Sequence, residues 1–192
     1  MSDISVIARH AVTVLAGQLA VMAFGVTDTI VAGRFSADAL AALSVASAVF
    51  VSVYVSLMGV LQALLPVWAE QHGRGETAAI GQSFRQSLYL AAAASVLGMG
   101  VLLFPEPLLR LTEVPDAMRE SVRDYLIIVG WALPSALFFR LYTTLNQALG
   151  RPQLVTWIQV GALVLKVPLS IWFTFGGWGI APQAAAGCAW AT

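Results

Sequence analysis

The stretch AVTVLAGQLAVMAFGVTDTIVAGR, residues 11–34, is long and apolar enough to cross a lipid bilayer as one helix. A spanning helix needs about 20 mainly apolar residues, because each adds about 1.5 Å against a hydrocarbon core of about 30 Å. Asp28 is the only charged residue between Ala11 and Gly33. A charge near the bilayer centre costs roughly 2.5–3.5 kcal/mol, so it persists where it has a function. We therefore predict a first span over residues 11–32 and a functional role for Asp28.

The composition of the 192-residue chain indicates an integral membrane protein. The chain is 59% hydrophobic and 10% charged, with a mean hydropathy of +0.82, whereas soluble domains carry about 25% charged residues. The net charge is zero, which suggests no nucleic-acid partner. Cys188 is the single cysteine, so no internal disulfide can form, and His10 and His72 lack metal-ligand spacing.

The rest of the chain divides into four more apolar spans and the start of a sixth. The four are predicted over residues 40–68, 87–104, 125–145 and 154–175. Residues 184–192 begin a further apolar segment that rises only about 13 Å. The predicted fold is therefore an all-α, polytopic transmembrane helix bundle. Counting Lys and Arg residues in the loops leaves its orientation open, because the two sides tie.

Three local signals lie between the predicted spans. Ser36 predicts an N-cap, with Asp38 in the first turn of the second helix. The charged stretch 106–124 predicts a short amphipathic surface helix or a loop. The sequence Gly150-Arg151-Pro152 predicts a tight turn before the fifth span.

Two charged residues lie well inside predicted spans, Asp28 in the first and Lys166 in the fifth. Asp28 is either a structural residue, hydrogen-bonded to a neighbouring helix, or a carboxylate that loads a proton or holds a cation. Lys166 lies about a dozen residues inside its span, too far for its stem to reach water easily. It either pairs with Asp28, which lowers the cost of both charges, or lines a polar cavity. The residues alone leave these alternatives open.

Prolines in three spans predict kinks. Ser170 follows Lys166 by four residues and shares its helical face, with Pro168 between them. Proline leaves the carbonyl four residues earlier without its helical donor, so Pro168 is expected to bend the fifth span. Pro66 and Pro134 predict similar kinks in the second and fourth spans, which favours a bundle that moves.

Other polar and aromatic residues complete the set of candidates. The candidates for a substrate cavity are Thr27, Gln62, Arg140 and Asn146. Arg140 is expected to snorkel to the interface, and Asn146 lies where it can cap the fourth helix. Aromatic residues near predicted span ends are expected to anchor helices at the membrane interface: Trp68, Tyr125, Trp131 and Trp178.

Several segments share their order and spacing with one transporter family. Residues 18–34, QLAVMAFGVTDTIVAGR, look like its first helix, and residues 58–75, from MGVLQALLP to GRG, look like the end of its second helix and the following loop. GQSFRQ at 81–86, LNQALGRP at 145–152 and the segment 183–192 are similar to the beginning of its third helix, the turn before its fifth and the start of its sixth. Together they resemble the N-terminal lobe of multidrug and toxic compound extrusion (MATE) transporters, over essentially the whole chain.

The resemblance implies twelve helices in two six-helix lobes, a cell-inner-membrane location and a cytoplasmic N-terminus. It implies export of cationic or amphipathic compounds in exchange for H+ or Na+, with no cofactor beyond that coupling ion. Asp28 matches the first-helix carboxylate implicated in cation coupling. Lys166 and Ser170 fall where many relatives carry polar or acidic partners. The implied partners are membrane lipid, small organic cations or amphipathic substrates, and a C-terminal lobe.

Two features depart from the family pattern. The first is Lys166 near the Asp28 carboxylate. The two residues form either a fixed internal salt bridge or a pair in which Lys166 takes part in the conformational switch of transport. Residues 1–192 match only an N-terminal lobe, without most of its sixth helix. We therefore expect a fragment or a truncated gene product that is inactive without the missing half.

Two other functions stay open. One is a flippase for lipid-linked substrates, which needs a basic cavity to which Lys166 and Arg140 could contribute. The other is an inactive membrane scaffold. An enzyme is not expected, because no Gly-x-Ser-x-Gly motif occurs and neither histidine lies within a span.

Overall fold

The computed structural model describes residues 3–111, 115–176 and 184–191, which form eight helices and, within these ranges, no strand. The helices are α1 (Asp3–Phe35), α2 (Ala37–Gln62), α3 (Leu64–Gly73), α4 (Thr77–Leu103), α5 (Glu106–Leu111), α6 (Asp116–Ala148), α7 (Pro152–Phe175) and α8 (Ala184–Trp190).

Five segments of the described chain are long and apolar enough to cross a membrane: Ala11–Phe35, Ala37–Gly73, Thr77–Leu103, Met118–Ala148 and Pro152–Phe175. Large apolar side chains such as Leu19, Met22 and Val26 on α1 are more than half exposed, as expected for surfaces that lipid covers. The prediction of an all-α bundle with five spans is confirmed, and the chain is a multi-pass membrane protein.

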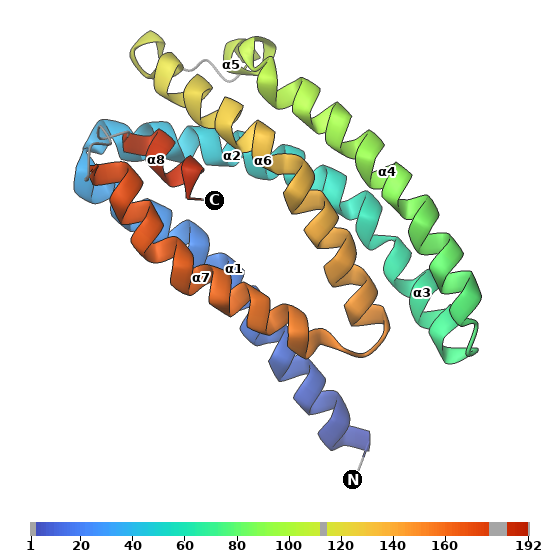
Figure 1. Ribbon diagram of the computed structural model, residues 1–192. Helices are drawn as coiled ribbons and strands as arrows, with labels where there is room; N and C mark the ends of the chain where they lie inside the picture. Colours follow the sequence, from blue (N-terminus) through green and yellow to red (C-terminus); the bar gives the residue numbers. More distant parts are fainter. Residues whose placement is uncertain (1–2, 112–114, 177–183, 192) are drawn as a thin grey trace.

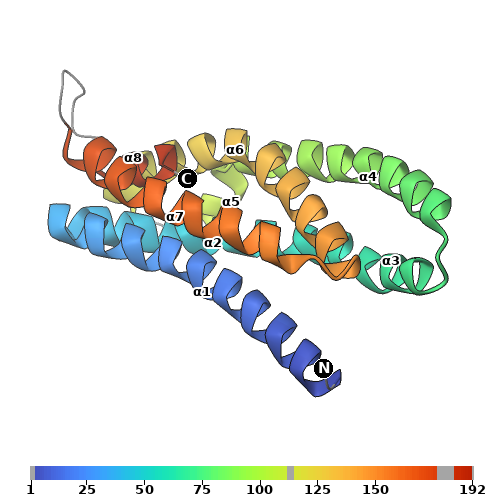
Figure 2. The same ribbon diagram turned by 60° about the horizontal axis from the view of Figure 1, so that its bottom comes forward.

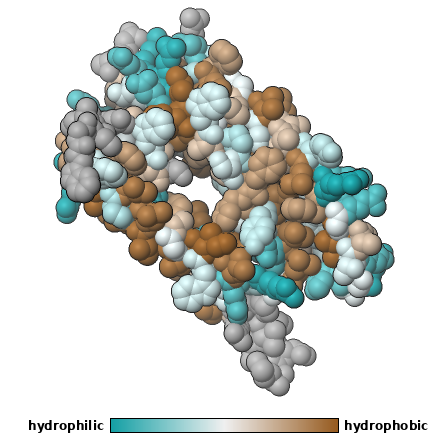
Figure 3. Space-filling view, viewed as in Figure 1, coloured by the Kyte–Doolittle hydropathy of each residue, from teal (hydrophilic) through white to brown (hydrophobic). Residues whose placement is uncertain are grey.

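The helices form two packed groups (Figures 1 and 2). α1 packs along α7, while α6 packs against both α2 and α4. The short helix α8 lies against α7 and α6 and so connects the groups at one end. Figure 3 shows a hollow between the α1–α7 pair and α6, in a face whose middle is mainly hydrophobic. The candidate site lies between α1 and α7.

One stripe of α6 forms much of the buried core. Its side chains recur every three or four residues and are fully buried: Val122, Leu126, Val129, Leu133, Leu137 and Leu141. Since lipid tails are as apolar as leucine, such a stripe holds helices together by close packing more than by exclusion of water.

Gly187 is the point at which α8 comes closest to α7. A Cβ at this position would lie 2.6 Å from the carbonyl carbon of Phe173 and from the amide nitrogen of Thr174. Backbone atoms cannot swing aside as a side chain can, and small residues are what allow membrane helices to approach so closely.

We therefore expect Gly187→Ala to lower the free energy of unfolding by about 1–3 kcal/mol, the usual range for overpacking. Thermal unfolding in detergent measures this loss. Gly100→Ala is the matched control, because a Cβ at Gly100 would meet nothing within 4 Å. Equal losses in the two variants would contradict the packing of α8 on α7.

Two local predictions are confirmed. The Ser36 hydroxyl oxygen accepts a hydrogen bond of 2.9 Å from the amide of Ala39, and Asp38 lies in the first turn of α2. Gly150 has a φ of +67°, a conformation that glycine adopts without strain, and Pro152 begins α7.

The second predicted span, residues 40–68, lies within one apolar segment, Ala37–Gly73. This segment is divided into α2 and α3 at Ala63, which keeps right-handed helical dihedrals (φ −61°, ψ −17°). Pro66 has no amide hydrogen to donate to the carbonyl of Gln62, four residues earlier, and this accounts for a break at that point. α6 and α7, in contrast, continue as helices through Pro134 and Pro168. Figure 1 shows that α6 bends near its middle.

The surface element predicted over residues 106–124 is only partly correct. Residues 106–111 form α5, but from Asp116 onward the chain already belongs to α6. Val122 is fully buried on this extension while Glu120 and Arg123 are exposed. The charges therefore mark the polar side of a helix that extends beyond the apolar span.

The interface-anchor prediction is wrong for two of its four aromatic residues. Trp68 is fully buried and donates from Nε1 to the Ser83 hydroxyl at 3.0 Å, and Tyr125 is 4% exposed. An indole buried in the bundle needs such a hydrogen-bond partner. Trp131 is well exposed, and Trp178 lies outside the described residues.

Candidate functional site

α1 turns the Asp28 carboxylate inward, away from the lipid-facing surface. Asp28 is 7% exposed, whereas Val26 and Ile30, two residues to either side, are 58% and 53% exposed. Ala20, Val31 and Ala32 are buried as well. These positions recur at helical spacing and form the inner face of α1. The apolar face of the helix thus lies toward lipid, and its one charge lies inside the bundle.

The carboxylate meets a lysine and a serine from α7. Lys166 Nζ donates to Asp28 Oδ2 at 2.9 Å, and the Ser170 hydroxyl donates to Oδ1 at 3.3 Å. Lys166 is 4% exposed and Ser170 is fully buried. We call Asp28, Lys166 and Ser170 the ion-pair site. Of the alternatives that the sequence leaves open for Lys166, the structure has the pairing with Asp28.

Several further groups surround the ion-pair site. The Phe24 ring centroid lies 5.3 Å from Lys166 Nζ, a distance at which an ammonium interacts with an aromatic face. Cys188 of α8 lies 3.9 Å from the Asp28 carbonyl oxygen and 3.4 Å from the Thr174 hydroxyl. Tyr125 of α6 and Cys188 are both buried and belong to one packed cluster. The site is therefore formed by α1, α7 and α8, and α6 packs against α8 beside it.

A second polar contact joins α6 to the break between α2 and α3. Arg140 donates from its terminal guanidinium nitrogen to Gln62 Oε1. Its Nε is buried and has no hydrogen-bond partner within the described chain. The expected snorkelling of Arg140 to the interface is thus replaced by a contact with another helix. The partner of the guanidinium in this contact is an amide oxygen and not a carboxylate.

The two polar clusters lie at different depths. Both clusters can be measured from the turn that joins α6 to α7. Arg140 lies 8 residues before the end of α6 at Ala148, and Lys166 lies 14 residues after the start of α7 at Pro152. At 1.5 Å per residue these are about 12 Å and about 21 Å along the helices. Arg140, in contact with Gln62, and Lys166, in contact with Asp28, therefore belong to two separate clusters.

The remaining candidates lie in neither cluster. The Thr27 hydroxyl donates to the carbonyl of Ala23 at 2.8 Å, and the Asn146 amide donates to the carbonyl of Tyr142 at 2.9 Å. Both groups therefore bond to the backbone of their own helix, one turn earlier.

Sequence reasoning missed Phe24, Tyr125, Thr174 and Cys188. Thr174 had a signal, because it continues the four-residue spacing of Lys166 and Ser170 along one face of α7. Phe24 likewise precedes Asp28 by four residues. Cys188 and Tyr125 had none, since they come from other helices whose rotation the sequence does not reveal.

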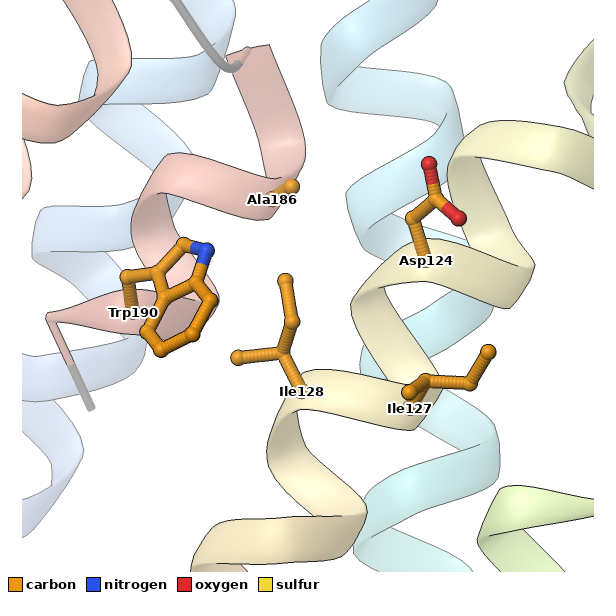
Figure 4. A pocket seen from close by; sticks show the side chains of 5 residues that line it. All are labelled: Asp124, Ile127, Ile128, Ala186 and Trp190. Carbon is orange, nitrogen blue, oxygen red and sulfur yellow. The ribbon is translucent and has the colours of Figure 1, made fainter. Parts of the chain in front are cut away.

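A pocket of about 370 Å³ lies between α6 and α8, lined by Asp124, Ile127, Ile128, Ala186 and Trp190 (Figure 4). Asp124 adjoins Tyr125 in the chain, and Ala186 and Trp190 lie two residues to either side of Cys188. Neighbours one or two residues apart do not share a helical face. The pocket is therefore separate from the ion-pair site.

Comparison with known proteins identifies relatives over most of the chain. The family model described as MatE matches residues 14–172. A probable multidrug resistance protein NorM of Aromatoleum aromaticum is 36% identical over 180 residues, which are 94% of this chain and 39% of that protein. A probable NorM of Neisseria meningitidis serogroup B is 30% identical over the whole chain, and the multidrug resistance protein PmpM of Pseudomonas aeruginosa is 30% identical over 95% of it. The chain spans about two fifths of the length of these relatives.

Proposed function

Since the chain belongs to the MATE family, we propose that it is the N-terminal lobe of a secondary active multidrug efflux antiporter. The antiporter exports cationic or amphipathic compounds in exchange for H+ or Na+. It lies in the cell inner membrane with a cytoplasmic N-terminus. A C-terminal lobe completes the transport path, because alternating access requires one repeat to move against the other.

The observation that carries this proposal is the ion-pair site. A carboxylate and an ammonium, each less than a tenth exposed, meet between two membrane-spanning helices. Charges inside a bilayer are expensive, and those that persist face the bundle interior and mark ion or substrate pathways. Asp28 is thus the cation-coupling carboxylate, and Lys166 and Ser170 are its partners.

The substrate cavity is proposed to include Gln62 and Arg140, with Thr27 and Asn146 near its walls. Gln62 and Arg140 join α2 and α6, two helices that pack against each other. Pro66, Pro134 and Pro168 are proposed as the hinges, because each removes one helical hydrogen bond from a span. The break at Ala63, three residues before Pro66, supports this role for the second span.

The ion pair favours an antiporter over a flippase for lipid-linked substrates. A flippase would need free basic groups to hold a phosphate, but the Lys166 charge is already neutralised by Asp28 at 2.9 Å. With Lys166 paired, Arg140 is the one of these two residues whose positive charge is left to bind a phosphate.

Reconstitution tests the proposal. The test uses the chain continued along its own reading frame into a second lobe, called here the two-lobe protein. In proteoliposomes we expect an imposed H+ or Na+ gradient to drive uphill movement of a fluorescent organic cation, and an ionophore that collapses the gradient to stop it. Translocation of lipid pyrophosphates without organic cations would instead identify a flippase, and no transport of either would identify a scaffold.

A further inference from the structure

The pocket between α6 and α8 combines an acidic and an aromatic side chain with apolar ones. Its volume of about 370 Å³ lies at the lower end of the range of about 300–1,000 Å³ that is usual for small-molecule sites. Figure 4 shows the Asp124 carboxylate at the level of Ala186. Ile128 and Trp190 each lie one helical turn further along their helices. The pocket therefore has a charged end and an apolar end.

The Asp124 side chain has no partner in the part of the chain that the structure describes. Within residues 3–111, 115–176 and 184–191 its carboxylate forms neither an ion pair nor a hydrogen bond. The neighbouring residue Arg123 pairs instead with Glu106, at 3.8 Å. Asp124 is also exposed. The pocket thus offers a negative charge that a ligand can reach from water.

The other walls of the pocket suit a cation with an apolar body. Trp190 is 59% exposed, and tryptophan attracts a positive charge over its ring more strongly than the other aromatic residues do. Ile127 and Ile128 provide apolar surface, whose removal from water favours the binding of an apolar body. An anion of the same shape would meet the like charge of Asp124. The chemistry of the pocket therefore selects an amphipathic cation.

The pocket lies near the membrane surface opposite the turn that joins α6 to α7. Asp124 precedes the end of α6 at Ala148 by 24 residues. This is about 36 Å of helix, which exceeds a hydrocarbon core of about 30 Å. Lys166 lies only about 21 Å from the same turn. The pocket is therefore further from this turn than the ion-pair site is.

The directions of α1 and α7 relate this surface to the side of export. The two helices run in the same direction, since Thr156 meets Thr13 near one end and Phe175 meets Phe35 near the other. The start of α1 therefore lies on the side of the turn between α6 and α7. With the cytoplasmic N-terminus proposed above, the pocket lies on the outer side, where an exported compound leaves.

We propose that this pocket is a binding site for monovalent amphipathic organic cations on the export side of the membrane, separate from the ion-pair site. Asp124 balances the charge of the cation, Trp190 contacts it through the indole ring, and Ile127 and Ile128 contact its apolar body. The proposal rests on the antiporter function above for the side of the membrane on which the pocket lies. The ligand class follows from the pocket itself.

Protection of a thiol placed in the pocket tests the proposal. Ala186→Cys is introduced into the two-lobe protein, and its reaction with the neutral reagent N-ethylmaleimide is followed by tandem mass spectrometry, which distinguishes it from the fully buried Cys188. Benzyltrimethylammonium, a monovalent cation with one aromatic ring, should slow the reaction with a saturable dependence on its concentration. Neopentylbenzene, in which carbon replaces the nitrogen, should protect at least about threefold less well.

Variants of the pocket identify the groups that hold the cation. In the Ala186→Cys protein, Asp124→Asn should weaken protection by about fivefold, near the upper limit for an exposed ion pair. Trp190→Leu should weaken it by about threefold. Asp38→Asn, which changes an exposed acid in the first turn of α2, is the matched control and should leave protection unchanged.

A second thiol position controls for effects outside the pocket. Ser121→Cys lies at an exposed position of α6 that does not line the pocket, and its rate of reaction should not depend on the cation. Equal protection with and without Asp124→Asn would overturn the proposal. A thiol at position 186 that never reacts would mean that the pocket is closed in the two-lobe protein, and this would overturn it as well.

The outcomes distinguish this inference from the antiporter function. If a gradient drives efflux but the cation does not protect the thiol, the antiporter function stands and the pocket is not a cation site. If the cation protects the thiol but neither H+ nor Na+ drives efflux, the pocket binds cations in a protein that is not an antiporter. Failure of both measurements would overturn both proposals.

Discussion

Asp28→Asn in the two-lobe protein is expected to abolish cation-coupled efflux. The asparagine amide keeps the size of the side chain and can still accept a hydrogen bond from Lys166, but it cannot hold a proton or balance a cation. Efflux should fall to the level of protein-free liposomes when an H+ gradient is imposed. The measurement is uptake of a fluorescent organic cation into inverted proteoliposomes, normalised to the amount of folded protein.

Two controls make this result specific to Asp28. Asp38→Asn changes an exposed acid in the first turn of α2 and should leave efflux unchanged. Asp28→Asn combined with Lys166→Met removes both charges, so no buried ammonium is left unpaired and loss of transport cannot be attributed to misfolding. Efflux at the wild-type rate in the Asp28→Asn variant would remove this carboxylate from the mechanism.

The second large effect is expected on stability. Lys166→Met leaves Asp28 as an unpaired carboxylate inside the bundle, which should lower the free energy of unfolding by about 3–5 kcal/mol. Asp28→Asn should cost less than this, because the amide remains a partner for Nζ. The combined variant should recover most of the loss, since replacing a whole buried pair by neutral groups of similar size is often neutral or stabilising by about 1–4 kcal/mol.

Unfolding in mixed detergents, followed by tryptophan fluorescence, measures all four members of this double-mutant cycle. A coupling free energy of several kcal/mol is predicted for side chains in direct contact, whereas distant residues add independently within about 0.5 kcal/mol. Additive losses for Asp28→Asn and Lys166→Met would mean that the two side chains do not meet.

The number of spans and the position of Asp28 within the first of them were predictable from the sequence. Runs of about 20 apolar residues locate membrane helices because the bilayer forbids unpaired backbone groups. The isolated charge of Asp28 was conspicuous for the same reason. Helix ends were less well predicted. The apolar residues of the fourth span begin near Tyr125, whereas the helix itself begins at Asp116. A helix that leaves the membrane needs no apolar residues, so its true start gives no hydropathy signal.

Contacts between helices were the part that the sequence could not decide. Asp28 and Lys166 are 138 residues apart, and each side chain direction depends on how its helix is rotated against the others. The burial of Trp68 had the same cause, because an aromatic residue near a span end is compatible with an interface or with a core. Pro66, Pro134 and Pro168 all predict kinks, and nothing in the sequence distinguishes the division of the second span near Pro66 from the continuous helices at Pro134 and Pro168.

Solid-state NMR of the chain in lipid bilayers offers the most direct test of the central claim, that Asp28 and Lys166 meet in the bundle interior. Lys166 is the single lysine of the chain, so lysine labelled with 15N at the side chain gives one ammonium signal. With aspartate labelled with 13C at the carboxyl carbon, we predict dipolar dephasing that corresponds to about 3–4 Å, as for a direct ammonium–carboxylate contact. This dephasing should disappear in Asp28→Asn. An ammonium signal without dephasing in the wild-type chain, or dephasing that persists in Asp28→Asn, would contradict the account.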